Sequence, residues 1–303
     1  QNIGKVTNSG VEIELDYNAF KNKDWSVSVG ANATFVKNKI KNLPATMKEN
    51  GYISGSKKWL EGKSIYEFWL RQWHGVDPQT GDGLYVADVS KYNQGNIGTG
   101  DGNITQSQFD EYKKTVVTID GKELTNSYTY AKYDFSGSSI PDVFGGFNVR
   151  VSYKNFDLAA VFSYQLGGQV LDTNYATMMS MTEFGYAQSP DLLKAWKQAG
   201  DITEVPRIDN SAAHTTNIGQ SYSTRWLTSS DYLNLRSVTI GYQFPKAWLS
   251  KVMLKSARLN LTAENLFMLK ARQGLNPMAN YSGVTYNEYM PSRNITLGLN
   301  VSF

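Results

Sequence analysis

Apolar and polar residues alternate along several stretches of the chain with the two-residue period of a β-strand. In Val11–Tyr17, apolar residues alternate with carboxylates. Trp25–Phe35 keeps the alternation for longer than the five or six residues usual in globular strands. A tilted strand of this length can cross a bilayer. Asn294–Phe303 alternates in the same way, with small uncharged residues on its polar side. Long strands with one apolar and one polar side are typical of an all-β, antiparallel transmembrane β-barrel.

Further strands of this kind bring the expected total to about nine, and the change of phase within Tyr232–Tyr242 predicts a β-bulge. The further strands are Ile65–Val76, Leu84–Asp88, Phe147–Tyr153, Leu158–Tyr164, Tyr232–Tyr242 and Leu259–Ala263. Short connections alternate with long ones, as periplasmic turns alternate with external loops in barrels. The short connections are Asn18–Asp24, Val76–Gly83, Lys154–Phe156 and Gln243–Ser256. An odd number of strands leaves two open edges, so we expect the remainder of the barrel to come from another segment or chain.

The polar sides of the predicted strands carry charged residues, which in a bilayer belong on the interior side of a barrel. An arginine on the lipid side near the bilayer centre would cost about 2–4 kcal/mol. We therefore expect Glu12, Glu14, Asp16, Arg150 and Glu264 to face the lumen. Aromatic residues gather beside the short connections, where they would form a girdle at the membrane interface. They are Tyr17, Phe20, Trp25, Tyr153, Phe156, Tyr242, Phe244 and Trp248.

Composition supports a barrel with large polar loops. Aromatic residues make up 13% of the chain, yet the mean hydropathy is −0.42. Lysine and arginine are scattered and the net charge is only +3, which argues against a nucleic-acid partner. No run of apolar residues is long enough for a transmembrane helix. The first residues, QNIGKVTNSG, do not form a signal peptide, so the chain is expected to be a fragment or a cleavage product of an exported protein.

The sequence offers little for catalysis or metal binding. With two histidines and no cysteine, we expect neither an enzyme nor a cofactor. Asp101–Ile104 resembles the centre of an EF-hand loop, which leaves structural calcium near Asp101 as an alternative. Ile97 and Gln108, however, occupy the two outer positions where such a loop has acidic ligands.

Substrate contact is instead expected from aromatic residues in the long loops, because aromatic faces with nearby polar groups bind sugars and peptides. The candidates are Trp59, Tyr92, Tyr130, Tyr175, Tyr186, Tyr222, Tyr286 and Tyr289. Ser189–Gly200 is predicted to form a short helix with Ser189 as N-cap and Pro190 at its first position, and Trp196 is expected to pack this loop rather than to bind ligand.

Motifs along nearly the whole chain resemble, in the same order, those of the SusC-like (SusC/RagA-type) TonB-linked outer-membrane transporters of Bacteroidota. They are Asn2–Leu15, Asp77–Asp88, Gly145–Gly168, the WKQAGDITEVPR segment Trp196–Arg207, Asp231–Pro245, Glu264–Phe267, Gly274–Met278 and Pro291–Phe303. A terminal Phe303 on a final strand resembles the signal read by the outer-membrane assembly machinery. The Gly100–Ile104 run is shorter than the fuller Asp/Asn-Gly-Asp-Gly run of the family, which weakens the calcium alternative.

This resemblance implies that residues 1–303 are the carboxy-terminal part of one 22-stranded barrel domain in the outer membrane, with the plug domain, the TonB box and the other strands outside this chain. It also implies TonB-dependent import of an oligosaccharide or oligopeptide, with a SusD-like surface lipoprotein as lid, the TonB complex as energy source and outer-membrane lipid as surroundings. Two alternatives remain at this point: a passive porin-like outer-membrane barrel, and a soluble secreted β-sandwich that acts as a binding module.

Overall fold

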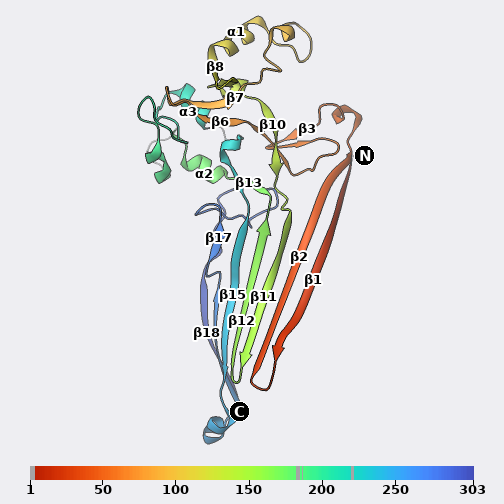
Figure 1. Ribbon diagram of the computed structural model, residues 1–303, viewed down its shortest axis with the longest axis vertical. Coiled ribbons are helices and arrows are strands. Elements are labelled where there is room, and N and C mark those ends of the chain that lie inside the picture. Colours follow the sequence, from red (N-terminus) through yellow and green to blue (C-terminus); the bar gives the residue numbers. More distant parts are fainter. Residues whose placement is uncertain (1–3, 182–184, 186, 220–221) are drawn as a thin grey trace.

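The computed structural model describes residues 4–181, 185, 187–219 and 222–303. Its main element is one antiparallel sheet of long strands, which in Figure 1 runs from a loop-rich end to the end near the carboxyl terminus. In sheet order the strands are β1 (Lys5–Lys21), β2 (Trp25–Asn42), β11 (Val143–Tyr153), β12 (Phe156–Leu166), β15 (Tyr232–Gln243), β16 (Ser256–Glu264) and β18 (Asn294–Ser302), and the short β17 (Met268–Lys270) pairs with β15. We call this element the wall sheet.

The register of the wall sheet collects polar side chains on one face. Asp16 of β1 lies opposite Gly30 of β2, which in turn lies opposite Asn148 of β11. At the other side of the sheet Thr239 lies opposite Thr262, with their hydroxyl oxygens 3.0 Å apart. Because side chains alternate between the two faces of a strand, most apolar residues of the wall strands lie on the opposite face, whereas Val36 of β2, Phe144 of β11 and Val161 of β12 lie on the polar one.

The apolar face of the wall sheet is open to the surroundings. The exposed fraction is 63% for Leu15 and 69% for Leu297, so these side chains are not packed against a second sheet within the described chain. This contradicts the β-sandwich alternative, in which the apolar rows of two sheets bury each other. An exposed face of this size is stable where lipid covers it.

Aromatic rings meet across the strands at the turn end, as the girdle interpretation predicts. The ring centroids of Trp25 and Tyr153 are 4.3 Å apart, and those of Phe156 and Tyr242 are 4.5 Å apart. The two-residue turn between β11 and β12 is tight because Lys154 has a φ of 50°. The predicted bulge in β15 is confirmed, since the β12–β15 register shifts between Ser237 and Leu235.

Two of the predicted strands do not belong to the wall sheet, and this corrects both the expected strand count and the position of one turn. The stretch Ile65–Val76 divides into β5 (Glu67–Arg71, 5 residues) and β6 (Trp73–Val76, 4 residues), too short to cross a bilayer. With its partner β7 (Gly83–Val86), β6 lies at the loop-rich end in Figure 1, not at the turn end. The alternating pattern was right, but it alone does not show which sheet a strand joins.

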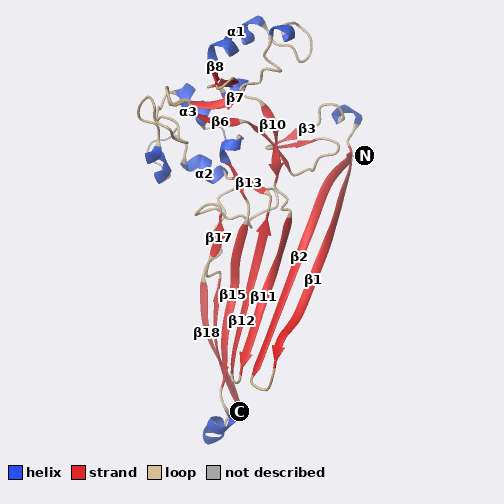
Figure 2. Cartoon of the chain, in the orientation of Figure 1, coloured by secondary structure: helices blue, strands red, loops and turns tan. Residues whose placement is uncertain are grey.

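Three small sheets and most of the short helices gather at the loop-rich end, as Figure 2 shows, whereas one helical segment lies at the opposite end near the carboxyl terminus. We call the loop-rich part the loop region. Its sheets have the orders β10 (Tyr133–Ser138), β5, β4 (Lys57–Trp59), β3 (Tyr52–Ser54); β6, β7, β9 (Lys122–Thr125), β8 (Val116–Ile119); and β13 (Gln169–Leu171), β14 (Leu227–Ser229).

The helices are short. The α-helices are α1 (Gln106–Thr115), α2 (Thr173–Met178), α3 (Ala212–Ile218) and, near the carboxyl terminus, α4 (Lys246–Leu249). The 3₁₀ turns are η1 (Ala45–Met47), η2 (Gln94–Asn96), η3 (Tyr128–Tyr130), η4 (Pro190–Lys194), η5 (Thr224–Trp226) and η6 (Ser250–Val252). Among the residues that the structure describes, no helix has the length and apolar character needed to span a membrane.

Candidate binding site

Charged residues predicted to face the lumen share the polar face of the wall sheet. Glu12, Glu14 and Asp16 alternate along β1, and Arg150 shares the face of Asn148 on β11. Glu264 ends the polar row of β16 opposite Asn294, whose amide nitrogen donates to it over 3.3 Å.

Glycines leave room on this face for larger polar neighbours. A Cβ at Gly30 would lie 2.5 Å from Asp16 Oδ1 and 2.6 Å from Asn148 Nδ2. The carboxylate and the amide therefore approach each other over the bare backbone of the strand between them.

The loop region has a hydrophobic core of its own. Phe68 and Leu70 on the inner side of β5 are fully buried, and they pack with Leu171 and Trp226, which belong to the long segment between β12 and β15. Because β5 is thus fixed on its inner side, its outer side chains are held in place although they are partly exposed.

The turn between β6 and β7 is covered by the segment around Trp196. The Trp196 indole Nε1 donates to the Pro78 carbonyl over 2.9 Å, and its ring lies where a Cβ of Gly81 would stand. Arg207 donates from Nη1 to the Thr80 carbonyl over 2.9 Å. The expectation that Trp196 packs this loop is confirmed by these contacts. Ser189 caps η4 as predicted by accepting from the Asp191 backbone N–H, but the predicted helix over Ser189–Gly200 is wrong beyond Lys194, where the 3₁₀ turn ends.

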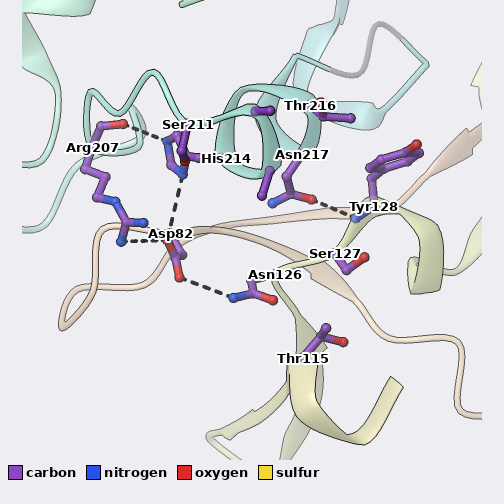
Figure 3. Close-up of a pocket in the computed structure, with 12 residues that line it drawn as sticks. Asp82, Thr115, Asn126, Ser127, Tyr128, Arg207, Ser211, His214, Thr216 and Asn217 are labelled. Carbon is purple, nitrogen blue, oxygen red and sulfur yellow. Dashed lines mark hydrogen bonds and ion pairs between the residues drawn. The ribbon is translucent and has the colours of Figure 1, made fainter. Parts of the chain in front are cut away.

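A polar cavity of about 600 Å³ opens between α3 and the β7–β9 strands, as Figure 3 shows. Asp82 lies at its edge, with Oδ1 2.8 Å from Arg207 Nη1 and 3.8 Å from His214 Nδ1. The Nε2 of His214 lies 2.8 Å from the Arg207 carbonyl oxygen, and since a carbonyl only accepts, Nε2 is the donor. Asn217 joins the two walls, accepting from the Tyr128 backbone N–H over 2.7 Å and donating to the Gly83 carbonyl over 3.1 Å.

Buried groups behind this cavity keep its walls fixed. The Tyr85 hydroxyl donates to the Asn217 carbonyl over 2.7 Å, and burial raises the pKa of Tyr85 to about 12, so the phenol stays a donor. Arg225 is held between the rings of Trp73 and Trp226, 4.7 and 4.3 Å from their centroids. Burial lowers the pKa of Arg225 to about 10.

Beside the cavity, three cations rest on aromatic rings along the outer side of β5 and β10. Lys58 Nζ lies 4.1 Å from the Trp69 ring centroid, and Lys63 Nζ lies 4.6 Å from that of Phe135. The Arg71 guanidinium lies 4.8 Å from the ring of Tyr128 and 4.7 Å from that of Tyr133. We call Lys58, Lys63, Arg71, Trp69, Tyr128, Tyr133 and Phe135 the cation–aromatic row. Tyr128 also lines the cavity, so the row and the cavity are continuous.

The segment that leads into the row is attached to the polar face of the wall sheet. Asn38, paired with Asn8 at the loop end of β2, accepts through Oδ1 from the Ser64 hydroxyl and the Ile65 backbone N–H, each over 2.9 Å. The register puts Asn8 and Asn38 on the same face as Glu12 and Glu14. The row therefore begins on the face that carries the charged residues.

The structure distributes the aromatic substrate-contact candidates over several environments. Tyr92 and Tyr130 are buried in a second core with Phe109 and Tyr112 under α1. Tyr175 is half-buried against Trp226. Trp59 is half-buried beside Tyr52, whereas Tyr222, Tyr286 and Tyr289 are exposed. Tyr186 lies outside the described residues. Their substrate role stays a prediction, as does the assembly role of the exposed Phe303.

The cation–aromatic row was missed as a site because β5 was taken for a barrel strand. A signal was present: Phe68 and Leu70 alternate with Trp69 and Arg71, so that the more polar side of this strand carries a ring and a cation. Lys58 and Lys63 lie shortly before β5 in the sequence, whereas Tyr133 and Phe135 of β10 lie far from it, so only the fold brings the whole row together.

The calcium alternative has little support in the geometry and stays a prediction. Asp101 is exposed in a turn closed by the hydrogen bond from Asn103 N to the Gly100 carbonyl, 3.0 Å long. In the part of the chain that the structure describes, no group of three or more histidine, cysteine, aspartate or glutamate side chains is arranged to hold a metal ion.

Known proteins resemble the chain over its whole length. TonB-dependent receptor P3 of Formosa agariphila is 26% identical over 321 residues, covering 100% of this chain and 29% of that protein. TonB-dependent receptor SusC of Bacteroides thetaiotaomicron is 24% identical over 316 residues, which are 27% of its length. No protein-family model matches the chain.

Solved structures show the same fold. The RagAB peptide transporter superposes with a TM-score of 0.75 at 23% identity, covering 100% of this chain and 30% of that one. The RagAB peptide importer in its closed-closed state gives a TM-score of 0.76 at 24% identity.

The chain thus spans less than a third of the length of the relatives it matches. The predicted fold class, part of an antiparallel transmembrane barrel, is confirmed, and so is the outer-membrane localisation. In sequence and fold, the chain therefore resembles the barrel portion of SusC-like TonB-dependent receptors.

Proposed function

We propose that the protein to which this chain belongs imports an oligosaccharide or oligopeptide across the outer membrane by TonB-dependent transport. The chain supplies part of the barrel wall and the loop region above it. The observation that carries the proposal is the division of the wall sheet into an exposed apolar face and a face with Glu12, Glu14, Asp16 and Arg150. A sheet of this kind separates lipid from a hydrated interior.

A SusD-like surface lipoprotein is the proposed partner at the loop end, where it would act as a lid, and the TonB complex is the proposed source of energy. The similarity to SusC and to the RagAB structures supports this assignment. The proposal includes no chemical conversion of the substrate, in keeping with relatives that are named as receptors and transporters.

Uptake by cells tests the proposal. Cells that express the full-length receptor and its neighbouring lipoprotein are expected to take up fluorescent oligosaccharides or oligopeptides, and to lose this uptake when TonB is deleted. Affinity purification of the receptor is expected to recover the lipoprotein. Uptake that persists without TonB, together with steady conductance of the purified protein in planar bilayers, would establish the passive porin instead.

A further inference from the structure

We propose that the cation–aromatic row binds an acidic oligopeptide in extended conformation, so that the substrate of this transporter is selected by its carboxylates. This inference rests on the proposed function and narrows its substrate class.

The charge of the row is not balanced. None of Lys58, Lys63 and Arg71 forms an ion pair with a carboxylate of the described residues. Glu67 lies on the same side of β5 as Trp69 and Arg71. Asp134, next in sequence to Phe135, is paired with Lys132 Nζ at 2.8 Å and also interacts electrostatically with Lys63. Three cations of the row therefore face Glu67 and an aspartate that is already shared with Lys132. An anionic ligand would complete this charge arrangement.

The rings hold the cations in place, and each cation covers one face of its ring. Lys58 lies over the Trp69 ring, and Arg71 lies over Tyr133 while its Nε donates to the Tyr128 carbonyl over 2.9 Å. Trp69 and Tyr133 are nearly parallel, with an interplanar angle of 12° and centroids 6.2 Å apart. A neutral sugar stacks on an open ring face, whereas here an ammonium or guanidinium group occupies one face of each ring. The row therefore favours an anion over a neutral glycan.

The spacing of the row's residues along β5 matches that of side chains in an extended peptide. The ring under Lys58 and the guanidinium of Arg71 come from alternate residues of β5, which repeat every ~6.6–6.8 Å along a strand. An extended peptide with an acidic residue at every second position presents carboxylates at the same ~6.6–6.8 Å repeat. Because the rings limit the motion of the cations, little side-chain freedom remains to be lost on binding.

The intact receptor, purified with its lipoprotein in detergent, tests the inference by fluorescence anisotropy. The probes are a labelled heptapeptide of alternating glutamate and alanine and its counterpart with glutamine in place of glutamate. The wild type is expected to bind the glutamate peptide about tenfold more tightly, with a preference that weakens as salt is added. The double variant Lys58→Gln, Lys63→Gln is expected to lose most of this preference, and Lys58→Arg, Lys63→Arg to keep it.

Lys154→Gln is the matched control, because Lys154 also lies over a ring, that of Tyr153 at 5.2 Å, but in the turn between β11 and β12, away from the loop region. It is expected to bind as the wild type does. Equal binding of the two peptides, or a preference unchanged in the double glutamine variant, would overturn the inference. Lysine-dependent binding of an oligouronate without binding of the glutamate peptide would also overturn it. Peptide binding and TonB-dependent uptake by cells are measured separately. Failure of this inference is therefore distinguishable from failure of the proposed function.

Discussion

Asp157 and Arg258 form an ion pair of 2.6 Å although a whole strand separates the strands on which they lie. Asp157 belongs to β12 and Arg258 to β16, and the pair passes over Gly241 of β15. Both side chains lie on the polar face, where the missing side chain of the glycine leaves the path open. The same arrangement occurs at Gly30 between Asp16 and Asn148.

Gly241→Leu is expected to break this ion pair and to lower the free energy of unfolding by about 1–3 kcal/mol. A Cβ at Gly241 would lie 2.7 Å from the Asp157 carboxylate oxygens and would clash with the Arg258 guanidinium. Thermal unfolding in detergent measures the effect. Gly100→Leu is the control, since its nearest neighbour is the end of the Asn103 side chain. Similar melting temperatures for Gly241→Leu and wild type would refute the role of the glycine.

Val149→Arg is expected to destabilise the lipid-embedded protein by about 2–4 kcal/mol, because it places a charge on the apolar face. Asn148→Arg is the matched variant on the polar face, where Asp16 lies close by, and its effect is expected to be much smaller. Denaturant unfolding from bilayers compares the two. Equal losses of stability would mean that the two faces do not differ in their contact with lipid.

Lys57 gives the loop region a stability that depends on pH. Burial lowers the pKa of Lys57 to about 7, although Glu67 acts in the opposite direction. Its ammonium lies 3.1 Å from the Phe68 ring centroid, and it donates to the Tyr66 carbonyl over 2.9 Å.

Between pH 7 and the ordinary lysine pKa of 10.5, the unfolded chain binds more protons at Lys57 than the folded one, so stability rises with pH in this window. The gain is on the order of a few kcal/mol. Lys57→Met is expected to remove most of the rise between pH 7 and 9.5, measured as melting temperature. Parallel pH profiles for variant and wild type would contradict the assignment. Tyr85 and Tyr112, whose pKa values burial raises to about 12, do not titrate in this interval.

Asp82→Asn is expected to loosen α3 from the β6–β7 turn, because it removes the ion pair with Arg207 and weakens the contact with His214. A local loss of about 1 kcal/mol corresponds to roughly fivefold faster amide exchange in Ala212–Ile218. Hydrogen–deuterium exchange with mass spectrometry measures it. Asp101→Asn, in an exposed turn, serves as the control. Unchanged exchange in α3 would show that Asp82 does not hold the cavity wall.

The wall sheet could be predicted from the sequence because its strands are long and their two faces are chemically different. Trp25–Phe35 carries this signal within one segment, and the phase change near Ser237 located the bulge. The loop region could not be predicted in the same way. Its strands are three to six residues long, and their partners are set by contacts such as Phe68 with Leu171, which no local pattern contains.

The sequence predicted which types of residue would form the candidate site, but not which residues. Aromatic loop residues were the correct type to consider, but Tyr92 and Tyr130 turned out to be part of a core, while Trp69 was assigned to the wall. The same residue types, tyrosine and tryptophan, supply both the rings that pack a loop and the rings that border a ligand. They are distinguished by burial and by the cations that the fold places over them, such as Lys58 over Trp69 and Lys63 over Phe135.

The wall sheet has β1 at one edge and β18 at the other, with five strands between them along an antiparallel path. The two edge strands therefore point in the same direction. If they met each other, the seam would be a parallel ladder, unlike every other seam of the sheet. A cylinder with uniform antiparallel pairing is possible only if an odd number of strands is inserted at this gap, whatever their source.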